Sequence, residues 1–149
     1  MSIQERDYLK KLLEQFAAAL ARIAGLKNEG KLEDAEDAVH SAGEEAFGAL
    51  TSTLDSLDAK SAAEVLGHRQ KLGVYAALTG ELADICARDG RQKHARSKYR
   101  RALELQLASL AVYPEGAEQT KTAIRALRAK LVLEDLPAEL RSALDALVG

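Results

Sequence analysis

Charged side chains of opposite sign are segregated along this chain, and their types and spacing could support binding chemistry. Residues 29–58 hold nine carboxylates and one lysine, whereas residues 88–101 hold seven cations and one carboxylate. On a helix surface such carboxylates attract cationic partners, while Lys and Arg attract carboxylates or phosphates. The candidate interaction patches are an acidic set, Glu33, Asp34, Glu36 and Asp37, and a basic set, Arg91, Lys93, Arg96, Arg100 and Arg101.

Three interpretations of these patches stay open. Both can be solvated helix faces, since exposed charges rarely need a further reason. They can instead be complementary surfaces that guide self-association or the docking of a charged partner. Alternatively, the basic helix over 91–101 can contact phosphates as an anion or nucleic-acid binding site. Nucleic acid is disfavoured because the net charge is −2, aromatic residues are 4% and Trp is absent, which leaves few side chains for base stacking.

Glu36, His40 and Glu44 have metal-ligand spacing, because they fall at successive i, i+4 positions of a helical pattern. A carboxylate and an imidazole on one helix face can ligate a metal, as Glu-x-x-His pairs do in di-iron bundles. Such a site needs a second copy, and neither His68 nor His94 has the matching carboxylate. We therefore expect a solvated face here, with no metal and no cofactor.

The other reactive side chains lack the neighbours that catalysis needs. Cys86 follows Leu82 and Ile85 and has no histidine in its local sequence, so we expect a buried, inert thiol. No G-x-S-x-G elbow and no G-x-G-x-x-G or G-x-x-x-x-G-K-[ST] phosphate loop occurs. The sequence therefore predicts that this protein is not an enzyme.

The composition favours one helical domain in a reducing compartment. The 149 residues suffice for a single core, helix-forming residues dominate, and only two prolines occur. A single cysteine cannot form an internal disulfide. The charged N-terminus predicts no signal peptide, and the absence of an apolar run of ~18 residues predicts no membrane span. We expect a soluble, cytoplasmic, all-α domain over residues 1–149, without a membrane partner.

One spacing that occurs twice, sixty residues apart, organises this domain. The two copies are Gly30, Ala35, Val39, Ala42 and Gly90, Ala95, Tyr99, Ala102. A turn glycine followed by small residues lets the second helix of a hairpin lie close to the first, which should bury the four alanines. The apolar period predicts hairpins over 3–50 and 68–112, a loop and short helix over 51–67, and C-terminal helices over 115–148.

Two local features refine this prediction. The stretch TSTLDSLD at 51–58 breaks the helical period and predicts a loop. Gly73 and Gly80 lie seven residues apart in a helical pattern, and each costs about 1 kcal/mol relative to alanine. We expect a close helix–helix contact at these glycines to offset that cost, and a helix break at Thr79–Gly80 is the alternative.

The second unit carries a family pattern in Leu82, Ala83, Gly90, Ala95, Tyr99, Ala102 and Leu103. Over about residues 76–107 this pattern resembles the tetratricopeptide repeat, and the first unit fits less well because Arg22 and Val39 depart from it. The whole chain is also similar to an uncharacterised family of bacterial helical-repeat proteins. The resemblance implies a tetratricopeptide-like short array of antiparallel hairpins. It also implies a non-catalytic adaptor or scaffold for a protein or peptide partner.

The two ends of such an array expose apolar faces that need a cap or a partner. Two terminal helices can cover these faces, and their apolar residues are Tyr8, Leu12, Phe16, Leu140, Leu144 and Leu147. Either helix can fold back on its own domain or pack against a second copy. With the opposed charge patches, this favours a homodimer whose interface includes one of these helices.

Overall fold

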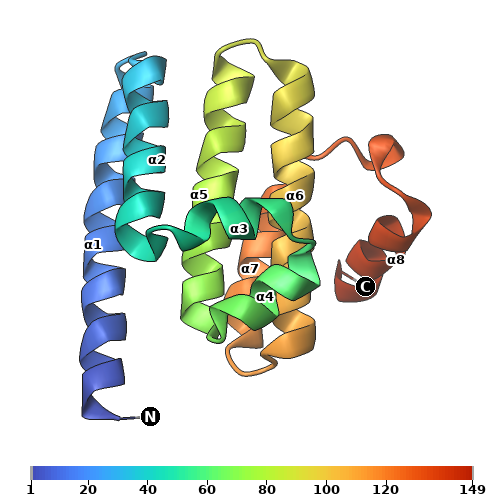
Figure 1. Cartoon of the computed structure of the whole chain (residues 1–149). Coiled ribbons are helices and arrows are strands. Elements are labelled where there is room, and N and C mark those ends of the chain that lie inside the picture. Colours follow the sequence, from blue (N-terminus) through green and yellow to red (C-terminus); the bar gives the residue numbers. More distant parts are fainter. Residues whose placement is uncertain (1, 149) are drawn as a thin grey trace.

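The computed structural model describes residues 2–148 and is all-helical over that range, which confirms the predicted fold class. Met1 and Gly149, which the domain prediction included, lie outside the described residues. The elements are α1 (Ile3–Asn28), α2 (Leu32–Phe47), α3 (Leu50–Ser56), α4 (Ala59–Leu66), α5 (Arg69–Arg88), α6 (Gln92–Val112), α7 (Ala117–Arg128), a 3-10 turn η1 (Leu133–Asp135) and α8 (Ala138–Val148). Helices α1–α2 and α5–α6 form two neighbouring antiparallel pairs (Figure 1).

The first hairpin begins at Ser2, whose hydroxyl accepts a hydrogen bond from the Glu5 amide and so caps α1. The chain reverses at Gly30, where φ is +75°, a conformation that a glycine adopts without strain. Beyond the turn, Ala35 is fully buried and lies in one cluster with Ile23 of α1. The small alanine side chain thus brings α2 close to α1, as the repeat spacing predicts.

The second hairpin repeats this construction with α5 and α6. Its turn is at Gly90, where φ is +79°, and Ala95 and Ala102 are buried behind it. Ala42, the fourth alanine of the pattern, is only partly buried against the same cluster as Ala35, so the expected burial of all four alanines is wrong at this position.

Helix α5 runs without a break through Gly73 and Gly80. The close helix contact expected at these glycines is wrong, because a Cβ added at either position would meet no atom within 4 Å. Both glycines therefore face open space.

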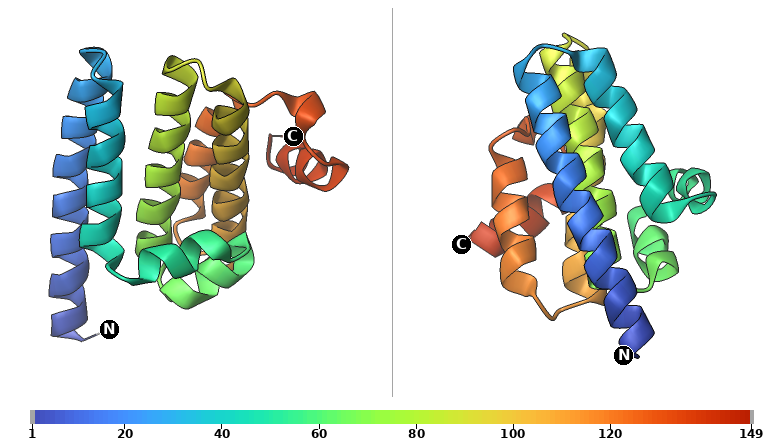
Figure 2. Two further views of the ribbon diagram at one scale, coloured as in Figure 1. Left: turned by 45° about the horizontal axis from the view of Figure 1, so that its top comes forward. Right: turned by 90° about the vertical axis from the view of Figure 1, so that its left-hand side faces the viewer.

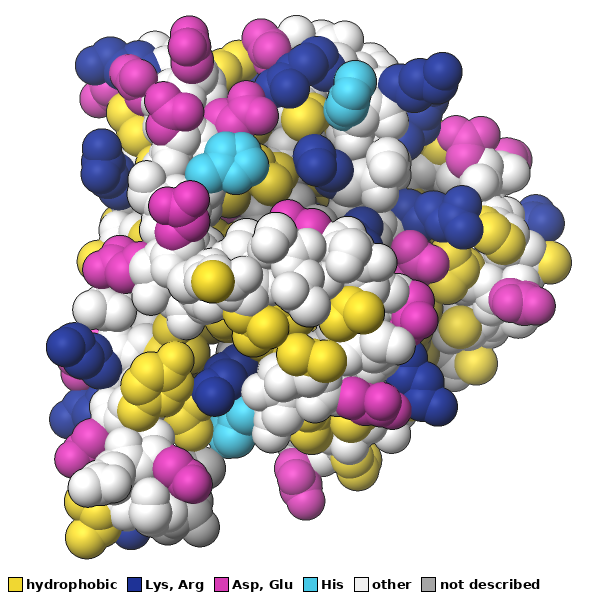
Figure 3. Space-filling view, viewed as in Figure 1, with side chains coloured by type: hydrophobic (Ala, Val, Ile, Leu, Met, Phe, Trp, Pro, Cys, Tyr) yellow, Lys and Arg dark blue, Asp and Glu magenta, His cyan; other side chains and the backbone are white. Residues whose placement is uncertain are grey.

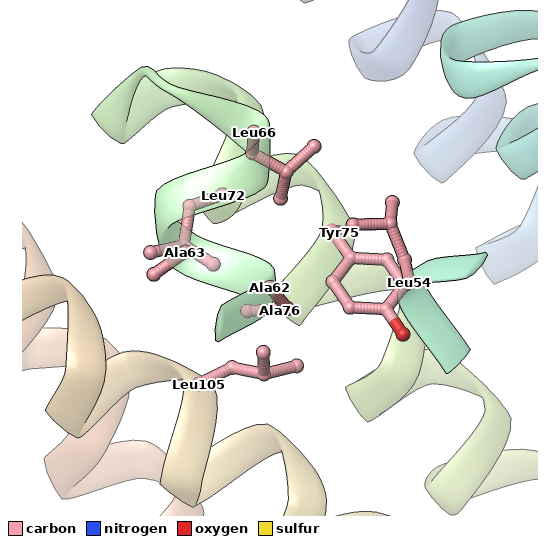
Figure 4. Packing of buried hydrophobic residues seen from close by; sticks show 8 residues of the cluster. All are labelled: Leu54, Ala62, Ala63, Leu66, Leu72, Tyr75, Ala76 and Leu105. Atoms are coloured by element: carbon pink, nitrogen blue, oxygen red, sulfur yellow. The ribbon is translucent and has the colours of Figure 1, made fainter. Parts of the chain in front are cut away.

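The loop expected over 51–58 is also wrong, because residues 50–56 form α3. Leu54 on this helix is fully buried and belongs to a cluster with residues of α4, α5 and α6 (Figure 4). The hydroxyls of Thr51 and Ser56 donate to the carbonyls of Gly48 and Thr53, so these polar side chains are satisfied within the helix. Burial of an apolar face therefore outweighs weak helix propensity in this segment.

The α5–α6 pair is covered on two sides. Helices α3 and α4 cross one side and α7 lies on the other, as the two views of Figure 2 show. Beyond α7 the chain turns back through η1, and α8 buries Leu144 in a cluster with Leu103 of α6 and Ile124 of α7. The second hairpin is therefore the centre of the domain, and every other unit packs against it.

Candidate functional site

The acidic and basic patches predicted from the sequence begin at the same end of the molecule. Carboxylates gather there over α1–α2, and Lys and Arg over α5–α6 (Figure 3). The two patches are joined within one chain, because Arg91 Nη2 lies 3.0 Å from Glu36 Oε2 and its Nε lies 2.9 Å from Asp89 Oδ2. The other three residues of the acidic set are exposed: Glu33, Asp34 and Asp37.

Between α2 and α6 the surface is hollowed into a cleft of about 530 Å³ that we call the central cleft. It is visible in Figure 3 above α3. Its lining comes from four helices: Val39, His40, Gly43 and Phe47 of α2, Thr51 and Asp55 of α3, Tyr75, Leu78, Thr79 and Leu82 of α5, and Ser97, Lys98, Arg100, Arg101 and Glu104 of α6.

The floor of the central cleft is apolar. Val39 and Leu78 are buried there, while Leu82 and Phe47 are partly exposed and contact the same cluster. Gly43 completes the α2 side, and a Cβ added to it would meet nothing within 4 Å. The floor therefore offers apolar surface and unfilled space for a side chain that enters from outside.

One end of the central cleft is closed by a polar cluster that fixes α3. The Tyr75 hydroxyl donates to Asp55 Oδ1 at 2.6 Å, and Arg101 Nη2 donates to the carbonyl of Leu54 at 3.0 Å. Burial and the hydrogen bond to Asp55 raise the pKa of Tyr75 to about 12. Arg101 also lies over the Tyr75 ring, with Cζ 5.9 Å from its centroid. These contacts make Arg101 a structural tether between α6 and α3.

Along the walls of the central cleft the charges differ in how they are neutralised. Arg100 Nε lies 3.9 Å from Glu104 Oε1, which is a long ion pair. Lys98 is only partly exposed, and no carboxylate among residues 2–148 lies within ion-pairing distance of its ammonium group. The α6 wall therefore presents a cation that is free to receive an acidic group.

A second cleft, of about 540 Å³, lies between α6 and the chain that follows α7; we call it the basic cleft. Its lining is Lys93, Arg96, Ser97, Tyr99, Arg100, Lys130, Leu131, Val132, Asp135 and Leu136. Three cations come from successive turns of α6, and the fourth, Lys130, comes from the turn after α7. The basic set of the sequence is thus divided, with Arg91 and Arg101 tied to other elements and Lys93, Arg96 and Arg100 on this cleft.

Behind the basic cleft lies a charge network that the sequence patterns did not indicate. Asp84 of α5 accepts hydrogen bonds from Lys130 at 2.8 Å, from Lys27 at 3.4 Å and from the Tyr99 hydroxyl. Burial by itself raises the pKa of Asp84, but the hydrogen bonds from Lys130 and Tyr99 outweigh it and hold this pKa below its usual value. Lys27 also pairs with Glu81. The network joins α1, α5, α6 and the turn after α7.

The residues proposed for a dimer helix are distributed between the core and the surface. Leu144 and Leu12 are buried within the chain, and Leu140, Leu147 and Phe16 are partly buried against its own clusters. Tyr8 remains 50% exposed. Helix α8 thus serves as an internal cap, and the part of the set available to a second copy is the beginning of α1. Self-association itself stays a prediction.

The reactive side chains considered in the sequence are also placed. Cys86 is buried beside Ala83 and Tyr99, in an apolar cluster. Glu36 is occupied by Arg91, and His40 lies at the rim of the central cleft. Among residues 2–148 no three His, Cys, Asp or Glu side chains lie close enough together to hold a metal ion.

Comparison with protein-family models, curated proteins and solved structures finds no match for this chain. Over the described residues, no helix has the length and apolar character needed to cross a membrane. The two clefts and their chemistry are therefore the basis for a functional proposal.

Proposed function

We propose that this protein is a non-catalytic interaction module, an adaptor or scaffold, that binds a short segment of a partner protein in the central cleft. The observation that carries this proposal is the construction of the cleft. Two helical hairpins hold an apolar floor open between them, and α6 supplies a partly buried, unneutralised lysine on one wall. An apolar floor with polar and charged groups on the surrounding walls is a usual form of a binding site.

The dimensions of the cleft indicate the kind of segment that fits. The lining residues of α2 run from Val39 to Phe47, which corresponds to about 12 Å along the helix axis. That length accommodates about three or four residues of extended chain. We infer a peptide with one apolar side chain for the floor and one carboxylate for Lys98.

We further propose that the protein is related to tetratricopeptide-repeat proteins and that it is located in the cytoplasm. The antiparallel hairpins, the two glycine turns and the buried alanines behind them support a repeat-like origin. Helical-repeat proteins offer extended surfaces to other macromolecules, which is consistent with an adaptor.

The test is the affinity of peptides selected from a random library on the immobilised protein, measured by fluorescence polarisation. Gly43→Leu should weaken binding at least ~tenfold, because the new side chain fills the floor of the cleft. The matched control is Gly25→Leu, at an exposed glycine of α1 where an added Cβ also meets open space.

Charge is tested in the same assay with Lys98→Glu, which should weaken acidic peptides by a similar factor. Lys10→Glu, on the exposed face of α1, should leave affinity unchanged. If the selected peptides bind the two cleft variants as tightly as the two control variants, the central cleft is not the binding site and the proposal fails.

A further inference from the structure

We propose that the basic cleft, which shares Ser97 and Arg100 with the central cleft, is a second site that binds a small ligand carrying a diphosphate group next to an apolar or planar part. The cleft brings Lys93, Arg96 and Arg100 of α6 to the same opening as Lys130. Among the described residues that line it, Asp135 is the one carboxylate, so cations outnumber carboxylates there. The segregation of charge along the sequence does not predict this cluster of four cations, because Lys130 lies outside the basic run of residues 88–101.

The α6 cations of this cleft have only long ion pairs or none, and Arg100 Nε lies 3.9 Å from Glu104 Oε1. Lys93, Arg96 and Arg100 follow one another at i, i+3 and i, i+4 spacing, where like charges repel across a helix face. Arg96 reaches Asp135 only at 3.9 Å, and both of these side chains are more than half exposed. No carboxylate among the described residues lies within ion-pairing distance of Lys93. An anion in the cleft would relieve this repulsion.

Phosphate oxygens fit this set of donors better than a single carboxylate does. The guanidinium groups of Arg96 and Arg100 can each give paired N–H donors to a phosphoryl group, and lysine adds a compact point charge. Two arginines and two lysines offer more donors than one carboxylate can accept, whereas a diphosphate can accept from all four side chains. Lys130 is already held in place by Asp84 at 2.8 Å, which positions its ammonium group before a ligand arrives.

The basic cleft also has apolar surface, which comes from Tyr99 of α6 and from the chain after α7. Leu136 and the ring of Tyr99 are buried there, Leu131 is partly buried, and Val132 is 46% exposed. This wall gives the non-phosphate part of a ligand a surface to lie on. The volume of about 540 Å³ is in the range of small-molecule sites. A bounded cleft of this size admits a nucleotide-sized molecule, whereas a nucleic-acid duplex would meet only its rim.

Isothermal titration with four probes tests the proposal: inorganic pyrophosphate, ADP, adenosine and a short single-stranded DNA. Pyrophosphate and ADP should bind saturably below about 1 mM, and ADP should bind at least ~fivefold more tightly because it also uses the apolar wall. Adenosine should bind at least ~tenfold more weakly than ADP. Equal affinities for pyrophosphate and ADP would overturn the assignment of the apolar wall to the ligand.

The double variant Arg96→Gln with Arg100→Gln should reduce ADP affinity at least ~tenfold while its helical circular dichroism stays that of the wild type. The matched control is Lys10→Gln with Arg22→Gln, which removes two exposed cations of α1. No saturable binding of either phosphate probe, or an equal loss in both double variants, overturns the proposal. Tighter binding of DNA than of ADP, with a steep dependence on salt, would instead identify a nucleic-acid surface.

Discussion

Replacing Gly73 and Gly80 of α5 by alanine should stabilise the fold, although both glycines lie in the centre of the domain. They occupy the fifth and twelfth positions of a 20-residue helix, so each substitution acts in the helix interior. An alanine there is more favourable than glycine by about 1 kcal/mol, because glycine loses more backbone freedom on folding. The added Cβ meets no atom within 4 Å at either site, so no clash offsets this gain.

The stabilising effects of Gly73→Ala and Gly80→Ala should add. Seven residues of helix separate the sites by about 10 Å, which is beyond the range at which neighbouring substitutions usually couple. The double variant should therefore gain about 2 kcal/mol in the free energy of unfolding, equivalent to a rise in Tm of about 4–8 °C for a domain of this size. Urea denaturation followed by far-UV circular dichroism measures the change.

Gly90→Ala supplies the opposite control, because φ at Gly90 is +79° and alanine is strained in that conformation. The free energy of unfolding of this variant should be about 1 kcal/mol lower than that of the wild type. If Gly73→Ala or Gly80→Ala proves destabilising instead, another helix must approach α5 more closely than the open space described here. The packing argument for the centre of the domain would then be refuted.

Further outcomes follow from the described contacts. Asp84→Asn should cost about 1–2 kcal/mol, because it leaves Lys130 without its partner in a partly exposed network. Folding lowers the pKa of Asp84, so its stabilising effect is present above the usual carboxyl pKa and is lost as the pH falls through the lower pKa of the folded state. In an acid titration, the free energy of unfolding should therefore fall less in Asp84→Asn than in the wild type. The phenolate absorbance of the wild type minus that of Tyr75→Phe isolates Tyr75, and this difference should titrate with a pKa of about 12. Leu144→Ala should cost about 2–5 kcal/mol if α8 caps the domain, and a neutral result would contradict that packing. Light scattering should give the mass of a dimer that Tyr8→Glu splits, whereas the mass of one chain in the wild type would reject self-association.

Periodicity and small residues were sufficient to predict the two hairpins. Gly30 and Gly90 have the positive φ of turn glycines, and Ala35, Ala95 and Ala102 behind them are buried, because these requirements are local to each hairpin. Helix α3 also had a local signal that was missed, since Leu50, Leu54 and Leu57 recur at helical spacing. The serines and threonines between them indicated a loop, and burial of Leu54 decided otherwise.

The clefts and the charge network could not be predicted in the same way, because they depend on how separate elements pack. Lys27 and Asp84 are 57 residues apart and come from different hairpins. Lys130 joins the cations of α6 only because the chain after α7 folds back across that helix. For the same reason the sequence could not show that Arg91 and Arg101 are tied within the chain while Lys98 is free.

The central claim is that a partner peptide occupies the cleft between α2 and α6, and amide chemical-shift mapping tests it most directly. A selected peptide titrated into the isotope-labelled protein should shift the amides of Val39, Gly43, Thr79 and Lys98, which all line that cleft. Amides on the exposed face of α1 should stay in place. Shifts that concentrate on the basic cleft or on α1, with the central-cleft amides unmoved, would contradict the account.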